Sequence, residues 1–158
     1  LVTVFLQYWA SKWAAKVRLS TGMLVGCLLY AVGFGSVGFF DSFLLIGFGV
    51  FLAGLGELIV SPGEQTLVSN IASRETRGRY LGMLMVFYNL GSAVGFFGAG
   101  MLGDYVAPRY LAGPWLIVGV LAVLAGVGFF RMRYSLTNEE DGKMTAPVPI
   151  KKDTVTLH

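Results

Sequence analysis

Apolar residues fill most of the chain in long runs that charged residues rarely interrupt. A helix needs about 20 such residues, rising 1.5 Å each, to cross the hydrocarbon core of a bilayer. No run alternates apolar and polar residues with period two, which argues against a transmembrane β-barrel. The pattern therefore predicts an all-α, polytopic membrane helix bundle with four full spanning helices. The uncharged runs are Leu19–Phe40, Ser42–Gly56 (continued by Leu58–Val60 after Glu57), Tyr80–Gly103 and Tyr110–Phe130.

The two ends of the chain differ from these runs. Residues 1–10 are apolar but too few to span, and the chain opens on Leu1 without a basic segment before it. We expect them to be the end of a fifth helix in a bundle truncated at its N-terminus. From residue 135 the sequence turns polar and charged, which is typical of disorder. We therefore expect a bundle over residues 1–134 and a disordered cytoplasmic tail over residues 135–158.

Composition supports the membrane interpretation. Hydrophobic residues make up 55% of the chain and charged residues 13%, against about 25% charged residues in soluble domains. Mean hydropathy is +0.68. A soluble fold of this size could not bury so much apolar surface, so the lipid bilayer is the predicted surrounding. Disordered chains, disulfide-framed secreted modules and ordinary cytosolic enzymes are excluded.

Lysine and arginine are unevenly distributed among the segments that connect the runs. All of them except Arg109 lie before the first run, between the second and third, or after the fourth. The positive-inside rule assigns these segments to the cytoplasm. We therefore predict a multi-pass protein of the cell membrane (plasma or inner) with a cytoplasmic C-terminus. No basic stripe is interleaved with aromatic residues, so the net charge of +3 does not indicate nucleic-acid binding.

The chain has few residues that could bind a metal ion or act as a catalytic nucleophile. The chain has one cysteine, Cys27, and one histidine, His158, so no zinc site or Cys/His dyad can be assembled. Cys27 lies inside an apolar run, where packing is the ordinary role. We predict no catalytic residue, no metal site and no cofactor, and therefore no enzyme.

Glu57 is a charge in the middle of a predicted span. It lies 16 residues after Asp41 and 17 before Arg74, or about 24 and 26 Å along a continuous helix. A carboxylate at that depth costs roughly 2.5–3.5 kcal/mol on insertion scales and must face the bundle or a water-filled cavity. Two interpretations stay open. Glu57 is either functional, as a proton carrier or counter-charge for a cationic substrate, or a structural partner of a basic residue elsewhere in the bundle.

Other polar groups at depth extend this candidate site. Glu64 lies two helical turns after Glu57 on the same face and is either interfacial or functional. Pro62 and Gly63 stand between them and predict a helix bend, because proline removes a backbone hydrogen bond. The third full span carries a tyrosine and one amide, which either line a cavity or join helices. The candidates for proton coupling or the substrate path are Glu57, Glu64, Tyr88 and Asn89.

Small residues recur every four positions in the third full span. This spacing puts them on one helix face, where another helix backbone can approach closely. We expect this helix to pack along most of its length against a partner, although glycine is also common in membrane helices generally. The residues are Gly91, Gly95, Ala99 and Gly103.

Three stretches together carry a resemblance to a known family. They are Gly56-Glu57 followed by Pro62, the basic loop that contains Arg74, Arg77, Gly78 and Arg79 before Tyr80-Leu81-Gly82, and the glycine-rich Asn89–Asp104. In this order they resemble the C-terminal half of a major facilitator superfamily transporter, with the drug:proton antiporter branch the most similar. The resemblance covers residues 1–134.

The resemblance implies twelve helices in two six-helix halves, with both termini cytoplasmic. Leu1–Ala10 would be the end of helix 8, and helices 9 to 12 would be Leu19–Phe40, Phe43–Ile71, Tyr80–Gly103 and Pro114–Phe130. The charge distribution gives the same orientation independently.

The function implied is secondary active transport, with proton-coupled efflux of small amphipathic or drug-like molecules as the main hypothesis. The partners implied are the bilayer, the missing N-terminal half, a small-molecule substrate and protons. The segment Lys12–Arg18 lacks the family's Gly-x-x-x-Asp-Arg pattern, and Gly95-Phe96 stands where the antiporter motif has Gly-Pro. The resemblance therefore assigns neither gating contacts nor a direction of transport to this chain. The alternatives are an uptake symporter or another small-molecule permease, and a non-transporting membrane scaffold or receptor.

Overall fold

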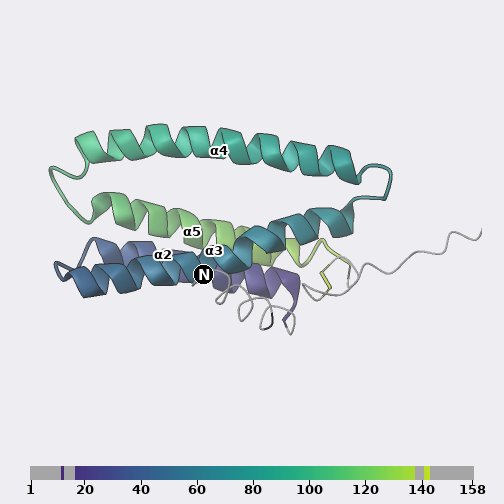
Figure 1. The fold of residues 1–158 in the computed structure, drawn as a ribbon, viewed down its shortest axis with the longest axis horizontal. Helices are drawn as coiled ribbons and strands as arrows, with labels where there is room; N and C mark the ends of the chain where they lie inside the picture. Colours follow the sequence, from purple (N-terminus) through teal and green to yellow (C-terminus); the bar gives the residue numbers. More distant parts are fainter. Residues whose placement is uncertain (1–11, 13–16, 138–140, 143–158) are drawn as a thin grey trace, which may run out of the picture.

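The described residues form four apolar α-helices, which lie side by side along the long axis of the molecule (Figure 1). The structure is a computed structural model that describes residues 12, 17–137 and 141–142. Each of the four helices is long and apolar enough to cross a membrane, and the described residues contain no strand. The prediction of an all-α membrane bundle with four spanning helices is confirmed. The predicted helix end at residues 1–10 lies outside the described residues. The helices are α2 (Leu19–Val37), α3 (Phe43–Ile71), α4 (Arg77–Tyr105) and α5 (Gly113–Met132).

Three of the four helices depart from the predicted bounds, and the two largest differences are at the end of α2 and at the start of α4. Helix α2 stops at Val37, before Phe40, where a turn begins with the Phe39 N–H donating to the Ser36 carbonyl at 3.1 Å. Helix α4 starts at Arg77, earlier than predicted, because the Ser73 carbonyl accepts the Arg77 N–H at 2.9 Å and so starts the first turn. Three residues of the predicted basic loop are therefore helical, and only Arg74 lies in the connection.

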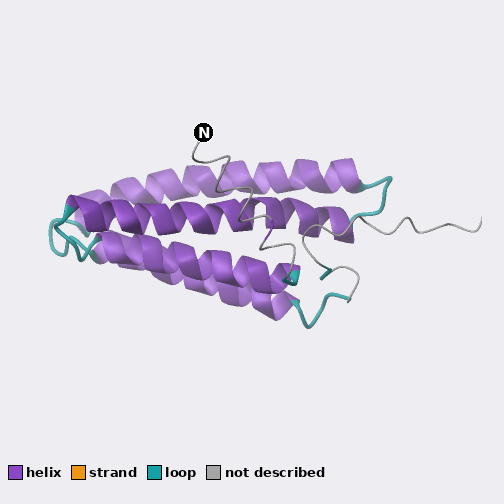
Figure 2. Ribbon diagram, turned by 60° about the horizontal axis from the view of Figure 1, so that its bottom comes forward, coloured by secondary structure: helices purple, strands orange, loops and turns teal. Residues whose placement is uncertain are grey.

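The connections lie at the two ends of the bundle (Figure 2). The α2–α3 and α4–α5 connections share one end, and the α3–α4 connection lies at the other (Figure 1). The second end also holds the start of α2 and the end of α5, with Arg18 and Arg133. The basic segments therefore gather at one end of the bundle, and Arg109 lies at the opposite end.

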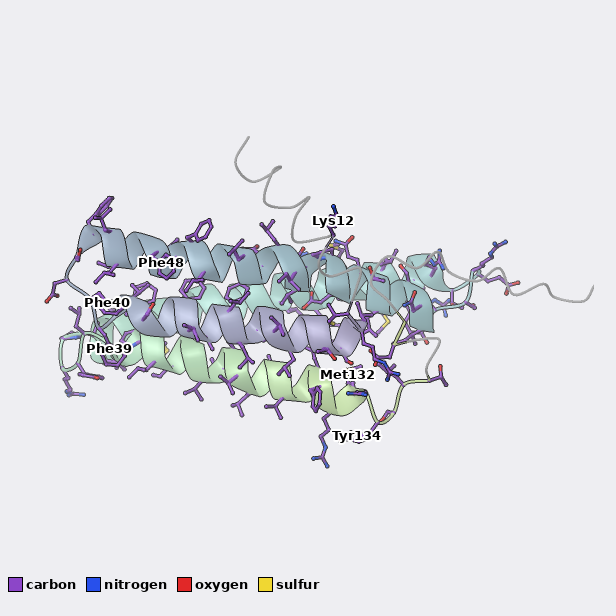
Figure 3. The ribbon with its side chains drawn as sticks, turned by 90° about the horizontal axis from the view of Figure 1, so that it is seen from below. Lys12, Phe39, Phe40, Phe48, Met132 and Tyr134 are labelled. Atoms are coloured by element: carbon purple, nitrogen blue, oxygen red, sulfur yellow. The ribbon has the colours of Figure 1, made fainter. Side chains whose placement is uncertain are left out.

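Helix α2 lies between α3 and α5 (Figure 3). Glycines bring α2 and α3 into backbone contact. A Cβ atom added at Gly33 would lie 2.6 Å from the Ala53 amide nitrogen and 2.6 Å from the Gly49 carbonyl oxygen. One added at Gly56 would lie 2.5 Å from the carbonyl oxygen of Gly26. Small residues on both surfaces thus let the two helices approach more closely than side chains would allow.

The opposite side of α2 packs on α5. A Cβ added at Gly126 would lie 2.9 Å from the Cβ of Cys27, which is buried. Nearer the other end, Phe34 of α2 stacks on Trp115 of α5 with a centroid separation of 6.2 Å. Helices α2, α3 and α5 therefore form a closely packed group of three.

The first turn of α2 is held by residues that follow α5. Leu19 and Met23 are fully buried and form a cluster with the buried Leu67 of α3, and Leu136 packs against this cluster. The Asp141 carboxylate accepts hydrogen bonds from the backbone N–H and the hydroxyl of Ser20, both at 2.9 Å. The sequence predicts a disordered tail from residue 135, whereas Asp141 is buried against α2, because its carboxylate satisfies an otherwise unpaired N–H of the first helical turn. Residues 143–158 lie outside the described residues.

Helix α4 lies to one side of the other three (Figure 1), and none of its residues is buried. Its glycine face has no neighbour among the described residues, since a Cβ added at Gly91, Gly95 or Gly103 would meet no atom within 4 Å. Ala99 is also exposed. Packing of this face on a partner helix stays a prediction.

Candidate functional site

Residues of α2, α3 and α4 line a half-open pocket with a volume of about 300 Å³. Helix α3 contributes residues spaced three to four apart, which places them on one helix face. Three of the four residues predicted for proton coupling or the substrate path line this pocket. The lining residues are Tyr30 of α2, Glu57, Val60, Ser61, Glu64 and Gln65 of α3, and Leu84, Met85 and Tyr88 of α4.

Glu57 occupies the midpoint of α3. The helix has 29 residues and Glu57 has equal numbers on either side, so it lies about 21 Å from each end. Its side chain is exposed and lines the pocket. Glu57 therefore lies at the middle of a helix long and apolar enough to span a membrane, and a polar pocket is the kind of surrounding that a carboxylate at mid-membrane depth would require.

The sequence did not single out three polar residues of the pocket, which are Tyr30, Ser61 and Gln65. Tyr30 lines the same pocket as Glu57 and comes from α2. The ring stacks on Phe34 with a centroid separation of 5.5 Å. A signal was available, because Tyr30 lies near the middle of the apolar run Leu19–Phe40, and a buried phenol usually finds a hydrogen-bond partner.

The carboxylates of the pocket have no basic partner in the part of the chain that the structure describes. Neither Glu57 nor Glu64 forms an ion pair with a lysine or arginine there. Glu64 is half-buried and lies two turns from Glu57. The pocket thus combines two carboxyl groups and two phenols with an apolar lining. Such a set of groups can bind protons or attract an organic cation.

Two other predicted features have different surroundings. Asn89 does not line the pocket, because its side-chain amide donates to the Met85 carbonyl of its own helix at 2.8 Å.

Helix α3 continues through Pro62 and Gly63, and in Figure 1 its second half runs obliquely toward α4. The Thr66 hydroxyl donates to the Pro62 carbonyl at 2.8 Å, a bond that often accompanies bending.

The basic residues at the start of α4 lie away from the pocket. The Arg77 guanidinium donates to the Ser69 carbonyl at 3.2 Å and so joins the end of α3 to the start of α4. Arg74, Gly78 and Arg79 are exposed. A Cβ added at Gly78 would meet nothing within 4 Å, so packing within the described residues does not require glycine there.

Comparison with known proteins finds one family model that matches nearly the whole chain and several similar curated proteins. The family model described as Major Facilitator Superfamily matches residues 1–156. Multidrug resistance protein MdtH of Sodalis glossinidius is 27% identical over 139 residues, covering 82% of this chain and 33% of its own length. The MdtH protein of Yersinia enterocolitica is 25% identical, with 82% and 33% covered, and that of Escherichia coli K12 is 25% identical, with 77% and 31% covered. The chain thus spans about a third of these relatives. No solved structure gives a significant match.

Proposed function

The chain belongs to the major facilitator superfamily, and on that premise we propose that it forms part of a proton-coupled exporter of small amphipathic, drug-like molecules. The pocket at the middle of α3 carries this proposal, because Glu57, Glu64 and Tyr88 meet there from two helices. Secondary transporters place their substrate and coupling-ion sites near the bilayer midplane, where irregular or polar surfaces line a cavity. The printed names of the curated relatives, which are multidrug resistance proteins, support export of drug-like molecules.

In this proposal Glu57 is the group that binds and releases the proton. A carboxyl group is neutral when protonated and charged when ionised, so its state changes the affinity of the pocket for a cation. Tyr88 and Met85 of α4 supply aromatic and polarizable surface for the apolar part of a substrate. The basic end of the bundle faces the cytoplasm, in keeping with the positive-inside rule.

The test is the substitution Glu57→Gln in the full-length protein that contains this chain. Glutamine keeps the shape and hydrogen-bonding capacity of the side chain but cannot ionise. We expect everted membrane vesicles with this variant to lose proton-driven accumulation of ethidium, a lipophilic organic cation. Glu75→Gln is the matched control, because Glu75 is an exposed glutamate in the α3–α4 connection. Normal proton-driven transport by Glu57→Gln would refute the coupling role.

A further inference from the structure

Residues beyond α5 supply hydrogen bonds that the start of α2 cannot make for itself. The N-cap of α2 is Arg18, whose guanidinium only donates hydrogen bonds and so cannot cap the first turn. The Asp141 carboxylate accepts from the Ser20 N–H and hydroxyl instead, both at 2.9 Å. The Gly142 carbonyl accepts from the Leu19 N–H at 3.3 Å. Because Asp141 and Ser20 are buried, the first turn of α2 depends on shielded bonds to a carboxylate 121 positions further along the chain.

The same segment reaches α3 through an apolar contact. Hydrogen-bonded turns continue past α5 as far as Leu136. Leu136 packs against the buried cluster in which Leu67 of α3 lies with Leu19 of α2. Leu67 comes three residues after Glu64 of the pocket, which is less than one helical turn. The residues after α5 thus hold α2 and α3 together within one turn of the pocket lining.

Helix α4 is not held to the other helices in this way within the described part of the chain. None of its residues is buried, and a Cβ added at any of its glycines meets nothing within 4 Å. The Arg77 guanidinium reaches the Ser69 carbonyl of α3 at 3.2 Å, but it does so from the first turn of α4. By contrast, α2 and α3 come into backbone contact at Gly33 and Gly56. Helix α4 therefore lines the pocket without the close packing that joins its neighbours.

We propose that Leu136, Asp141 and Gly142 form a clasp, which ties the basic ends of α2, α3 and α5 into one unit and leaves α4 as the wall of the pocket that moves. The negative charge of Asp141 adds to the clasp, because a carboxylate is stabilised at the N-terminus of a helix. The pocket residues of α2 and α3 belong to the clasped unit, whereas Tyr88 moves with α4. The part of this inference that concerns the pocket rests on the proposed function.

The experiment measures distances between pairs of spin labels by pulsed electron paramagnetic resonance. It uses the full-length protein in lipid nanodiscs, with its native cysteines replaced. The first pair, Ile71→Cys with Tyr134→Cys, joins the end of α3 to the residues after α5 and lies within the clasped unit. The second pair, Tyr80→Cys with Tyr134→Cys, joins α4 to the same residue, and all three positions are exposed. We expect ethidium to shift the second distance and to leave the first unchanged.

Substitutions at Asp141 test the clasp itself through the first pair. We expect Asp141→Ala to raise the fraction of displaced distances about fivefold, the change in an equilibrium that corresponds to the loss of one helix cap. Asp141→Asn keeps an acceptor oxygen and should give a narrower distribution than Asp141→Ala. Glu75→Ala, which removes an exposed carboxylate from the α3–α4 connection, should match the unsubstituted protein. Equal distributions for Asp141→Ala and Glu75→Ala would overturn the clasp.

The two measurements keep the inference distinct from the proposed function. The ethidium comparison leaves Asp141 unsubstituted, so it decides the question even where Asp141→Ala fails to fold. In a protein that exports ethidium, equal shifts of both pairs refute the clasped unit, and an unshifted second pair refutes α4 as the moving wall. A protein that exports no ethidium, but in which Asp141→Ala displaces the first pair, keeps the clasp and refutes the transport role.

Discussion

Substitution of Gly33 by alanine tests whether glycine contacts hold α2 against α3. The added Cβ would lie 2.6 Å from two backbone atoms of α3 and 2.9 Å from the Cβ of Ala53. Carbon atoms in favourable contact stand at about 3.5–4.0 Å, so the two helices must separate by roughly 1 Å. Backbone atoms cannot move aside as a flexible side chain can, and overpacking of this kind costs about 1–3 kcal/mol.

Gly35→Ala is the matched control for this prediction. It lies two residues further along α2, and a Cβ there would meet nothing within 4 Å. Both alanines gain the same helix propensity over glycine, about 1 kcal/mol, so the difference between the variants isolates the packing term. We expect Gly33→Ala to be less stable than Gly35→Ala by about 1–3 kcal/mol. Titration of the purified protein with dodecyl sulfate, followed by far-UV circular dichroism, measures both free energies of unfolding. Equal stability of the two variants would show that the α2–α3 surface is looser than the structure has it.

Two further predictions concern the buried carboxylate beyond α5 and access to the pocket. Asp141→Ala should lower the free energy of unfolding in the same titration by about 1 kcal/mol, the usual value of an N-terminal helix cap. The control is Glu75→Ala, which changes an exposed acidic residue and should leave the free energy of unfolding unchanged. Equal free energies for the two variants would contradict the contact between Asp141 and Ser20. A cysteine placed at Ser61, which lines the pocket, should react with a membrane-impermeant maleimide in the full-length protein, while the buried Cys27 should not. A Ser61→Cys variant that resists labelling would argue for a sealed or lipid-facing position.

The number and extent of the helices could be predicted because the bilayer imposes them. Every backbone polar group in lipid must be satisfied within its own segment, so an apolar run of sufficient length has one stable conformation. The bounds of α3 are those that the family resemblance implied, whereas the uncharged runs alone extend only from Ser42 to Val60. The start of α4 was not predicted, because it is decided by hydrogen bonds to Ser73 in the connection rather than by hydropathy.

Contacts between distant segments could not be predicted in the same way. Four-residue spacing of glycine shows that a helix can be approached closely, but it does not name the helix that approaches. The stripe on α4 drew attention, yet the glycine contacts in the described structure lie between α2 and α3 and between α2 and α5. Tyr30 and Asp141 were missed for the same reason, because Tyr30 joins the pocket and Asp141 meets Ser20 only after the helices have packed.

The position of the pocket follows from the directions in which neighbouring residues of α3 point around the helix axis. Neighbouring residues on a helix point about 100° apart. Gly56 faces the α2 backbone so closely that no side chain fits between them, and the next residue must therefore point elsewhere. Glu57 points to the side where α4, which buries none of its own residues, leaves room for a pocket. The same contact that brings α2 against α3 thus directs the carboxyl group away from the packed surface. A large residue at position 56 would disturb both the packing and the site, whereas one at Gly54, where an added Cβ meets nothing within 4 Å, should disturb neither.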